Sequence, residues 1–332
     1  MQTPQKERRT TAADVARALG LSRATVGFVL NDTPGQTIPE TTRQRVLAEA
    51  QRLGYRPHSA ARALASGRTN VILMVLPDWP MDFNLRRNIE EASLALDEAG
   101  FALVTYTPHP TGAARPLWES LQPDAVVSLR GLSEEQVKAI RDAGVARIVP
   151  DPDELAALEP YVEKGPALQV EHLAALGHHR IIFAGSPDLR IADLVAARLS
   201  AAQSAADYTS IGPIARVDVD YLNPDLPRAV ASWRDAGITA VACYNDDIAA
   251  AVIGAALRAG LSVPADLAVI GHDDTPLALT MHPQLSTINV DTAGLGRYTA
   301  ALTLSAVNGS PPPVAGPEFT SVLVIRASTA TL

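Results

Sequence analysis

Several apolar runs with the composition of buried strands are followed at once by polar or aromatic residues. Carboxylates and amides exchange hydrogen bonds with the hydroxyl groups of a polar ligand, and the ring of Trp79 or Phe83 can stack on an apolar ring face. The residues that follow the runs are Asp78, Trp79, Ser186, Asn245, Asp246, Asp273 and Asp274. Together they predict a binding site for a small polar molecule.

These residues can form one site only if the strands before them end at the same edge of a sheet. The surrounding sequence predicts such a sheet. Apolar runs alternate with amphipathic helical stretches, as is typical of βαβ units with a parallel sheet. One series extends from 71–77 (VILMVLP) through a helix near 84–100 to 146–150, and a second extends from 167–177 to 267–274. Ligands of open α/β sheets bind beyond the carboxyl ends of the strands, where the polar residues occur.

The charge of the chain is divided unevenly along its length. Residues 1–70 hold 11 of the 28 Lys and Arg residues but only 5 of the 36 Asp and Glu residues, an excess of six positive charges. The remainder has an excess of 14 negative charges, and the net charge is −8. A basic head on an acidic body predicts that the head alone meets a polyanion.

Other classes of protein are disfavoured by the sequence. No apolar run approaches the roughly 18 residues of a membrane span, and no signal region is visible, so a cytosolic chain is expected. The lone Cys243 has no disulfide partner. His178 and His179 precede a strand and point to different sides, and His272 lacks the companions of a catalytic or metal site. We therefore expect no enzymatic activity, metal or cofactor.

Two short helices are predicted in the basic head. Thr11 and Asp14 form a capping box for a helix of about two turns, and Gly20 tolerates the positive φ of a tight turn. Ser22 then caps a second helix that runs through Leu30. Two helices joined in this way make a helix-turn-helix.

A third helix is predicted from Pro39 to Gly54, which allows three helices to close a small core. The apolar residues expected to face this core follow helical spacing. They are Val15, Ala18 and Leu19 in the first helix, Val26, Val29 and Leu30 in the second, and Val46, Leu47, Ala50 and Leu53 in the third.

The second helix is the candidate recognition helix, whose first turn enters the major groove. Arg23 can bridge guanine O6 and N7, and Ala24 can touch a thymine methyl group. Thr25 is assigned to a phosphate. Gly27 either lets the helix approach the sugar-phosphate wall closely or simply weakens the helix by about 1 kcal/mol relative to Ala.

Two stretches of the sequence carry a family resemblance. DVARALGLSRATVGFVLND (14–32) and RVLAEAQRLGYRPHSAARALASGRTNVI (45–72) resemble the lactose/galactose-repressor family of bacterial transcription regulators. The family usually has Thr-Val-Ser-Arg where this chain has Thr25-Val26-Gly27-Phe28. The usual phosphate-binding Ser and base-reading Arg are therefore replaced, and Phe28 either packs on the helices or touches thymine methyl groups.

A hinge is expected at 56–68 (RPHSAARALASGR), where Pro57 can open a short helix. Leu64 is its one large apolar residue. The resemblance implies that two such helices pair in the minor groove and that Leu64 wedges into the central base step, which kinks DNA. The alternative is that Leu64 docks on the body.

The resemblance covers about residues 10–329 and implies the domain organisation. A helix-turn-helix head at 1–56 and a hinge at 57–68 precede an effector-binding and dimerisation domain at 69–332. This domain is expected to be a two-subdomain, periplasmic-binding-protein-like, doubly wound α/β core. Its N-subdomain comprises about 69–165 and 291–316, and its C-subdomain about 166–290 and 317–332.

The same resemblance completes the predicted sites. DNA contacts are expected from Thr11, Ser22, Arg23, Ala24, Thr25, Gly27, Phe28, Asn31, Tyr55, His58, Ala61 and Leu64. Effector contacts are expected from Asp78, Trp79, Phe83, Ser186, Arg198, Asn245, Asp246, Asp273 and Asp274, although one of the last two can instead cap the following segment. Ser200 stands where many members have a second Arg after Arg198, which places a standard sugar site in doubt.

These observations predict a homodimeric, ligand-responsive transcription factor, most readily a repressor, that binds a pseudo-palindromic DNA operator. A small molecule such as a sugar or related polar metabolite would modulate its affinity for DNA from the cleft between the subdomains. The alternative is a solute-binding protein or a sugar-modifying enzyme on the same fold. No membrane partner is expected.

Overall fold

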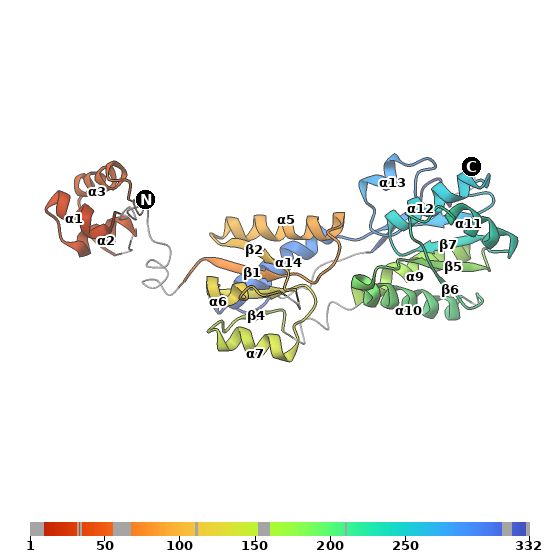
Figure 1. Ribbon diagram of the computed structural model, residues 1–332, viewed down its shortest axis with the longest axis horizontal. Coiled ribbons are helices and arrows are strands. Elements are labelled where there is room, and N and C mark those ends of the chain that lie inside the picture. The colour runs from red at the N-terminus through yellow and green to blue at the C-terminus, as the bar shows by residue number, and fades with distance from the viewer. Residues whose placement is uncertain are drawn as a thin grey trace, which may run out of the picture. The chain divides into compact units, whose positions relative to one another are not determined.

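The computed structural model describes residues 10–31, 33, 35–55, 68–109, 112–151, 160–209, 211–313 and 321–329, with the backbone alone for 160–163. The chain divides after Asn70 into two compact units, the head and the body, whose elements are labelled in Figure 1. Within the described residues, none of the helices combines the length and apolar character needed to cross a membrane.

The head consists of three helices, α1 (Ala12–Leu19), α2 (Arg23–Leu30) and α3 (Glu40–Arg52). The predicted caps are present. Thr11 and Asp14 form a capping box, Gly20 has a φ of 64°, and the Ser22 hydroxyl accepts a hydrogen bond from the Thr25 amide. The helices enclose a core of Val15, Ala16, Val26, Val29, Val46 and Ala50. Local capping thus sets the helix-turn-helix, and apolar packing holds the third helix against it.

Two of the predicted inward positions in the head are wrong. Leu47 is 48% exposed, and Ala18 is also exposed, whereas Ala16 is buried in its place. Successive residues of a helix are about 100° apart, so burial of Val46 turns its neighbour Leu47 toward solvent. The core of the head therefore leaves out two of the apolar side chains that the sequence pattern placed in it.

The first lobe of the body is built around a parallel sheet with the strand order β2-β1-β3-β4 (Figure 1). The strand β1 and the facing helix α5 carry much of its core, because Ile72, Met74, Ala92 and Leu96 are buried together. The elements are β1 (Val71–Val75), α5 (Phe83–Glu98), β2 (Ala102–Tyr106), α6 (Leu117–Leu121), β3 (Ala125–Ser128), α7 (Glu134–Asp142) and β4 (Ile148–Val149).

The second lobe repeats this arrangement with the order β6-β5-β7-β8, again parallel. Its core gathers the inner strands β5 and β7 with α12, and Phe183, Val241 and Val252 are fully buried. The elements are α9 (Pro160–Ala175), β5 (Ile181–Gly185), η1 (Leu189–Ile191), α10 (Ala192–Tyr208), β6 (Ala215–Asp218), α11 (Leu226–Asp235), β7 (Ala240–Cys243), α12 (Asp246–Arg258), β8 (Ala268–Ile270) and α13 (Pro276–Thr280). The predicted pair of doubly wound halves is confirmed.

The last elements connect the two lobes. The strand β9 (Thr287–Asn289) pairs antiparallel with β10 (Val322–Val324), and between them the chain forms α14 (Thr292–Asn308). This helix packs extensively on α5 of the first lobe, whereas the Ser328 hydroxyl donates to the carbonyl of Val269 in the second lobe. Each lobe is therefore completed by a segment distant in sequence.

The close packing of α14 on α5 depends on Gly296. A Cβ at this position would lie 2.3 Å from the backbone oxygen of Asn88 and 3.1 Å from the amide nitrogen of Ala92. We expect Gly296→Ala to reduce the free energy of unfolding of the body by about 1–3 kcal/mol, because backbone must shift to admit the methyl group.

Urea denaturation measures this loss. Gly254→Ala on α12 is a suitable control, because the added Cβ would meet the far end of the flexible Arg258 side chain. Equal stability of Gly296→Ala and the unmodified protein would contradict the predicted clash.

Candidate DNA-binding surface and ligand cleft

The first turn of α2 presents a small polar surface. Arg23 and Ala24 are exposed, as a base-contacting role requires. The Ser22 hydroxyl lies 3.0 Å from the Thr25 amide nitrogen and 2.8 Å from the Thr25 hydroxyl, so the two side chains form one cap. This cap leaves the exposed Arg23 as the positively charged side chain at the start of α2.

The two unusual residues of α2 are arranged differently. Apart from its chain neighbours and the backbone of its own helix, no atom of the described residues lies within 4 Å of the position that a Cβ of Gly27 would occupy, so packing among these residues does not require a glycine. Phe28 is half-buried, but it is not among the side chains packed on the core of the head. The α2 surface therefore combines open space at Gly27 with an apolar ring at Phe28.

The remaining predicted DNA contacts are placed as follows. Thr11 is exposed and is held by its capping box with Asp14. Asn31 is exposed at the end of α2, whereas Tyr55 is half-buried and packs against the core of the head. His58, Ala61 and Leu64, with the hinge segment 56–67, lie outside the described residues.

A cleft in the body contains two adjoining cavities of about 340 Å³ each. One wall follows β1 in the first lobe, and the other follows strands β5 to β8 in the second lobe. Both cavities are lined by Asp82, Asn245 and Asp247. Of the predicted effector residues, the lining includes Trp79, Phe83, Ser186, Asn245, Asp246 and Asp273, but not Asp78, Arg198 or Asp274.

Asn245 and Asp246 join β7 to α12 and have different surroundings. Asn245 caps α12, because its side-chain oxygen accepts from the Ile248 amide at 2.9 Å. Asp246 is fully buried, and its carboxylate accepts from Thr287 Oγ1 at 2.6 Å and from the Thr275 amide at 2.7 Å. Burial raises the pKa of Asp246 to about 7, although these hydrogen bonds oppose the shift. Its carboxylate ties α12 to the segments after β8 and at β9.

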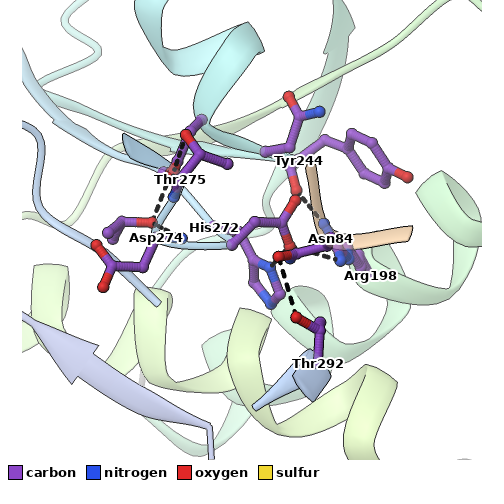
Figure 2. Close-up of polar contacts among 12 residues, drawn as sticks. Asn84, Arg198, Tyr244, His272, Asp274, Thr275 and Thr292 are labelled. Atoms are coloured by element: carbon purple, nitrogen blue, oxygen red, sulfur yellow. Dashed lines mark hydrogen bonds and ion pairs between the residues drawn. The ribbon is translucent and has the colours of Figure 1, made fainter. Parts of the chain in front are cut away.

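Behind the cleft, Asp273 is the centre of a buried ionic cluster. Its Oδ1 accepts from His272 Nδ1 at 2.6 Å and from Arg198 Nη2 at 3.2 Å. Arg198 also donates to the Tyr244 carbonyl, and its guanidinium carbon lies 4.6 Å from the centroid of the Tyr244 ring (Figure 2). Burial opposes the ionisation of Asp273, but Arg198 and His272 outweigh it and hold the pKa of Asp273 below its ordinary value.

The two adjacent aspartates after β8 are directed to different partners. Both have left-handed backbone conformations, with φ of 107° at Asp273 and 46° at Asp274. Asp274 accepts from Arg326 Nη2 at 2.7 Å and from Asn289 Nδ2 at 3.0 Å, and it does not line the cleft. Such conformations are costly for non-glycine residues and are often found at functional sites. Asp273 is therefore the candidate for a ligand contact.

The other predicted effector residues follow β1 in the first lobe or β5 in the second lobe. Asp78 is exposed outside the lining, whereas Trp79 is half-buried within it. The Trp79 indole nitrogen is buried and has no hydrogen-bond partner among the described residues. Phe83 lines one of the two cavities, and Ser186 lines the other.

Sequence reasoning missed three important lining residues, Asp82, Asp247 and Tyr244. Asp82 caps α5 by accepting from the Leu85 amide at 2.7 Å, and an Asp before a helical stretch is a signal that could have found it. Asp247 is next to the predicted Asn245–Asp246 pair, on the exposed face of the first turn of α12. Loss of surrounding water raises the pKa of both carboxyl groups, and the negative charge of Asp273 raises both pKa values further.

The helix-turn-helix head and the two-lobed body both match known families. Residues 11–58 match the model described as "Bacterial regulatory proteins, lacI family", and residues 170–329 match that of a periplasmic binding protein-like domain. The chain resembles the lactose/galactose-repressor family in both of these parts. It thus combines a DNA-binding domain of this family with a ligand-binding type of body, and the predicted family and fold are confirmed.

Similarity to individual regulators extends over nearly the whole chain. The chain is 28% identical to the HTH-type transcriptional regulator MalR of Streptomyces coelicolor over 341 residues, which covers 97% of each chain. It is also 28% identical to the regulator GalR of Escherichia coli, with 97% of this chain and 96% of that protein covered. Both relatives are named as transcriptional regulators.

Solved structures show the same architecture. A Lac repressor dimer bound to operator and the anti-inducer ONPF aligns with a TM-score of 0.77 and 25% identity, covering 98% of this chain and 100% of that chain. A complex of the transcriptional regulator CelR with cellobiose has a TM-score of 0.60 and 23% identity, with 96% and 100% covered. The second comparison supports the fold alone.

Proposed function

We propose that the protein is a ligand-responsive transcription factor that represses its target genes by binding a pseudo-palindromic operator as a homodimer in the cytoplasm. The observation that carries this proposal is the pairing, in one chain, of an exposed helix-turn-helix with a two-lobed body that contains a polar cleft. The Lac repressor dimer bound to operator is the structural precedent. The proposed boundaries are 1–56 for the head, 57–68 for the hinge and 69–332 for the body.

DNA recognition is assigned to the start of α2. Arg23 is exposed and can form a bidentate contact with guanine, whereas Ala24 offers a methyl group to thymine. Open space at Gly27 allows the DNA backbone to approach α2 closely, and the half-buried Phe28 can touch a thymine methyl group. By resemblance to the family, Leu64 of the hinge is assigned to the central base step, where an apolar wedge kinks DNA.

Ligand response is assigned to the cleft of the body. A molecule that contacts residues after β1 and residues after β7 and β8 at the same time favours a closed arrangement of the two lobes. It changes DNA affinity only by the difference in its affinity for the two arrangements of the dimer. Asp273 is the most suitable anchor, because Arg198 and His272 keep its carboxylate ionised and fixed.

Selection of binding sites from a randomised duplex pool tests the proposed function. We expect the purified protein to enrich one palindromic motif, with a spacing set by the dimer and a flexible central pyrimidine–purine step. Failure to enrich any motif, both alone and in the presence of metabolite extract, would contradict the proposed function.

The role of Arg23 gives a more specific prediction. We expect Arg23→Ala to weaken binding to the selected operator by about 1–3 kcal/mol and to relax base preference at one symmetric pair of positions. Quantitative binding to single-base operator variants measures both effects. Arg45→Ala, which removes the same charge from an exposed position on α3, should leave the base preference unchanged. A uniform loss across all operator variants would instead assign Arg23 to a phosphate.

A further inference from the structure

The described lining of the cleft is strongly acidic. Among its described residues are six aspartates, but no Lys, Arg or His. Neutral polar groups are provided by Asn84, Asn245, Ser186 and Thr275, which can exchange hydrogen bonds with hydroxyl groups. The cleft therefore offers a ligand many acceptors and an excess of negative charge.

Three of the six aspartates already have hydrogen-bond or ionic partners in the protein. Asp246 is fully buried in its own hydrogen-bond network, Asp273 is paired with Arg198, and Asp188 is paired with Arg190 at 2.6 Å. The other three aspartates, Asp82, Asp220 and Asp247, form no ion pair with a basic side chain in the described part of the chain, although the charge of Arg198 partly offsets that of Asp82. Asp82 and Asp220 accept backbone amide hydrogen bonds, from Leu85 and Leu222, and these bonds do not cancel a full charge.

Two of these unpaired carboxylates are destabilised in their ionised form. Loss of surrounding water raises the pKa of Asp247, and the negative charge of Asp273 raises it further. The pKa of Asp82 is raised by the same two effects, with Asp247 adding to the repulsion. A neutral ligand would leave this repulsion in place, whereas a positively charged group between the carboxylates would convert it into attraction.

The walls of the cleft also contain aromatic groups suited to such a ligand. Trp79, Phe83, Tyr221 and Tyr244 contribute to the lining, and the faces of aromatic rings attract cations. Tyr244 is only 5% exposed, yet no hydrogen bond of its hydroxyl group is found within the described residues. The Tyr244 hydroxyl is therefore available to a ligand atom in the cavity that this side chain lines.

A bound metal ion does not account for these carboxylates. Over the described ranges, the structure contains no group of three or more His, Cys, Asp or Glu side chains placed to hold a metal ion. The carboxylates are instead distributed along the cleft beside amides and aromatic rings. This arrangement fits a molecule with several polar groups better than a single ion.

We propose that the effector is an organic cation, a hydroxylated molecule with a protonated amine that lies between Asp82, Asp247 and Asp273. This inference rests on the proposed function and names the ligand class of the same cleft. The amine contacts the carboxylates, the hydroxyl groups contact Asn245 and neighbouring amides, and an apolar face of the ligand packs on the aromatic wall.

Thermal shift measurements on the full-length protein test this proposal with molecules of similar shape and different charge. One set is D-glucosamine, D-glucose and D-glucuronate, and a second is 1,4-diaminobutane, 1,4-butanediol and succinate, all at equal ionic strength. We expect the amine of at least one set to raise the melting temperature in a concentration-dependent manner. The neutral and anionic members of that set should have no comparable effect.

Two variants locate the binding of the amine. Asp247→Asn should weaken binding of the stabilising amine about tenfold or more, because it removes an ionic hydrogen-bond acceptor. Asp235→Asn is the matched control, since it removes the same charge at an exposed position on α11 outside the cleft lining. It should bind the amine as tightly as the unmodified protein.

Three results would overturn the proposal. These are binding of a neutral or anionic member at least as tight as that of its amine, absence of binding by both amines at millimolar concentration, or equal losses in Asp247→Asn and Asp235→Asn. Operator selection with the same preparation separates this inference from the proposed function. Enrichment of a palindrome without amine preference refutes the ligand class alone, whereas amine binding without any enriched duplex refutes the DNA-binding function.

Discussion

Replacement of Arg198 by methionine is expected to reduce the free energy of unfolding of the body by about 3–5 kcal/mol. Asp273 is 8% exposed, and Arg198 is its charged partner at 3.2 Å. A buried carboxylate that loses its partner retains its desolvation penalty without the compensating attraction. Methionine has a similar length, so the loss reflects charge more than an empty volume. The Tyr244 carbonyl would also lose its hydrogen bond from Arg198.

Urea denaturation followed by tryptophan fluorescence measures this effect. Trp79, Trp118 and Trp233 are the three tryptophans of the sequence, and all belong to the body. The double variant Arg198→Met/Asp273→Asn should recover most of the lost stability, because Asn removes the buried charge and tolerates a left-handed backbone conformation. A loss of stability in the single variant with no recovery in the double variant would show that the charge pair is not the cause.

The stability of the body should also depend on pH through Asp246. Burial raises its pKa from 3.8 to about 7, so the folded state binds a proton that the unfolded state releases. The resulting stabilisation is fully present below about pH 4 and is lost as the pH rises through about 7. A shift of this size corresponds to about 4 kcal/mol in total. Asp246→Asn should remove this dependence.

The comparison of two denaturation series, at pH values between about 4.5 and 8.5, isolates this contribution. Other buried groups titrate in both proteins, including His272, whose pKa is lowered by burial. The difference in unfolding free energy between Asp246→Asn and the unmodified protein should therefore shift in favour of the variant as the pH increases. Parallel curves over the whole range would contradict the raised pKa of Asp246.

These two predictions concern the support of the cleft from behind. Asp246 connects α12 to Thr275 and Thr287, and Arg198 connects α10 to Asp273 and the Tyr244 carbonyl. The hydrogen bonds of Asp246 and the ion pair of Asp273 thus fix the segments after β7 and β8. These segments present Asn245 and Asp273 to the cleft. A ligand-binding wall of this kind is preorganised before the ligand enters, which reduces the cost of binding.

The sequence by itself determined those features that depend on short-range interactions. The capping box at Thr11, the positive φ of Gly20 and the cap at Ser22 involve residues within a few positions of one another. The buried strands β1, β5, β7 and β8 were likewise visible as apolar runs. Because parallel strands bring their carboxyl ends to one edge, Asn245 and Asp273 could be predicted to lie near each other.

Elements without such a pattern could not be predicted. The strand β6 is an edge strand whose residues Ala215, Arg216 and Asp218 are exposed, so it lacks the apolar run that indicated its neighbours. The pairing of β10 with β9 joins segments more than 30 residues apart along the chain. Long-range pairing of this kind depends on the assembled lobe, and local propensity does not encode it.

Only the tertiary structure decided which polar residues face the cleft. Asp273 and Asp274 are adjacent and identical in type, but their left-handed backbone directs one toward Arg198 and the other toward Arg326. Asp246 was expected to face the ligand on the same grounds as Asn245, yet its carboxylate is buried and bonded to the protein. Asp82 and Asp247 come into the site through contacts between distant segments. Side-chain direction and burial arise from packing over long sequence distances, which residue type and spacing alone do not specify.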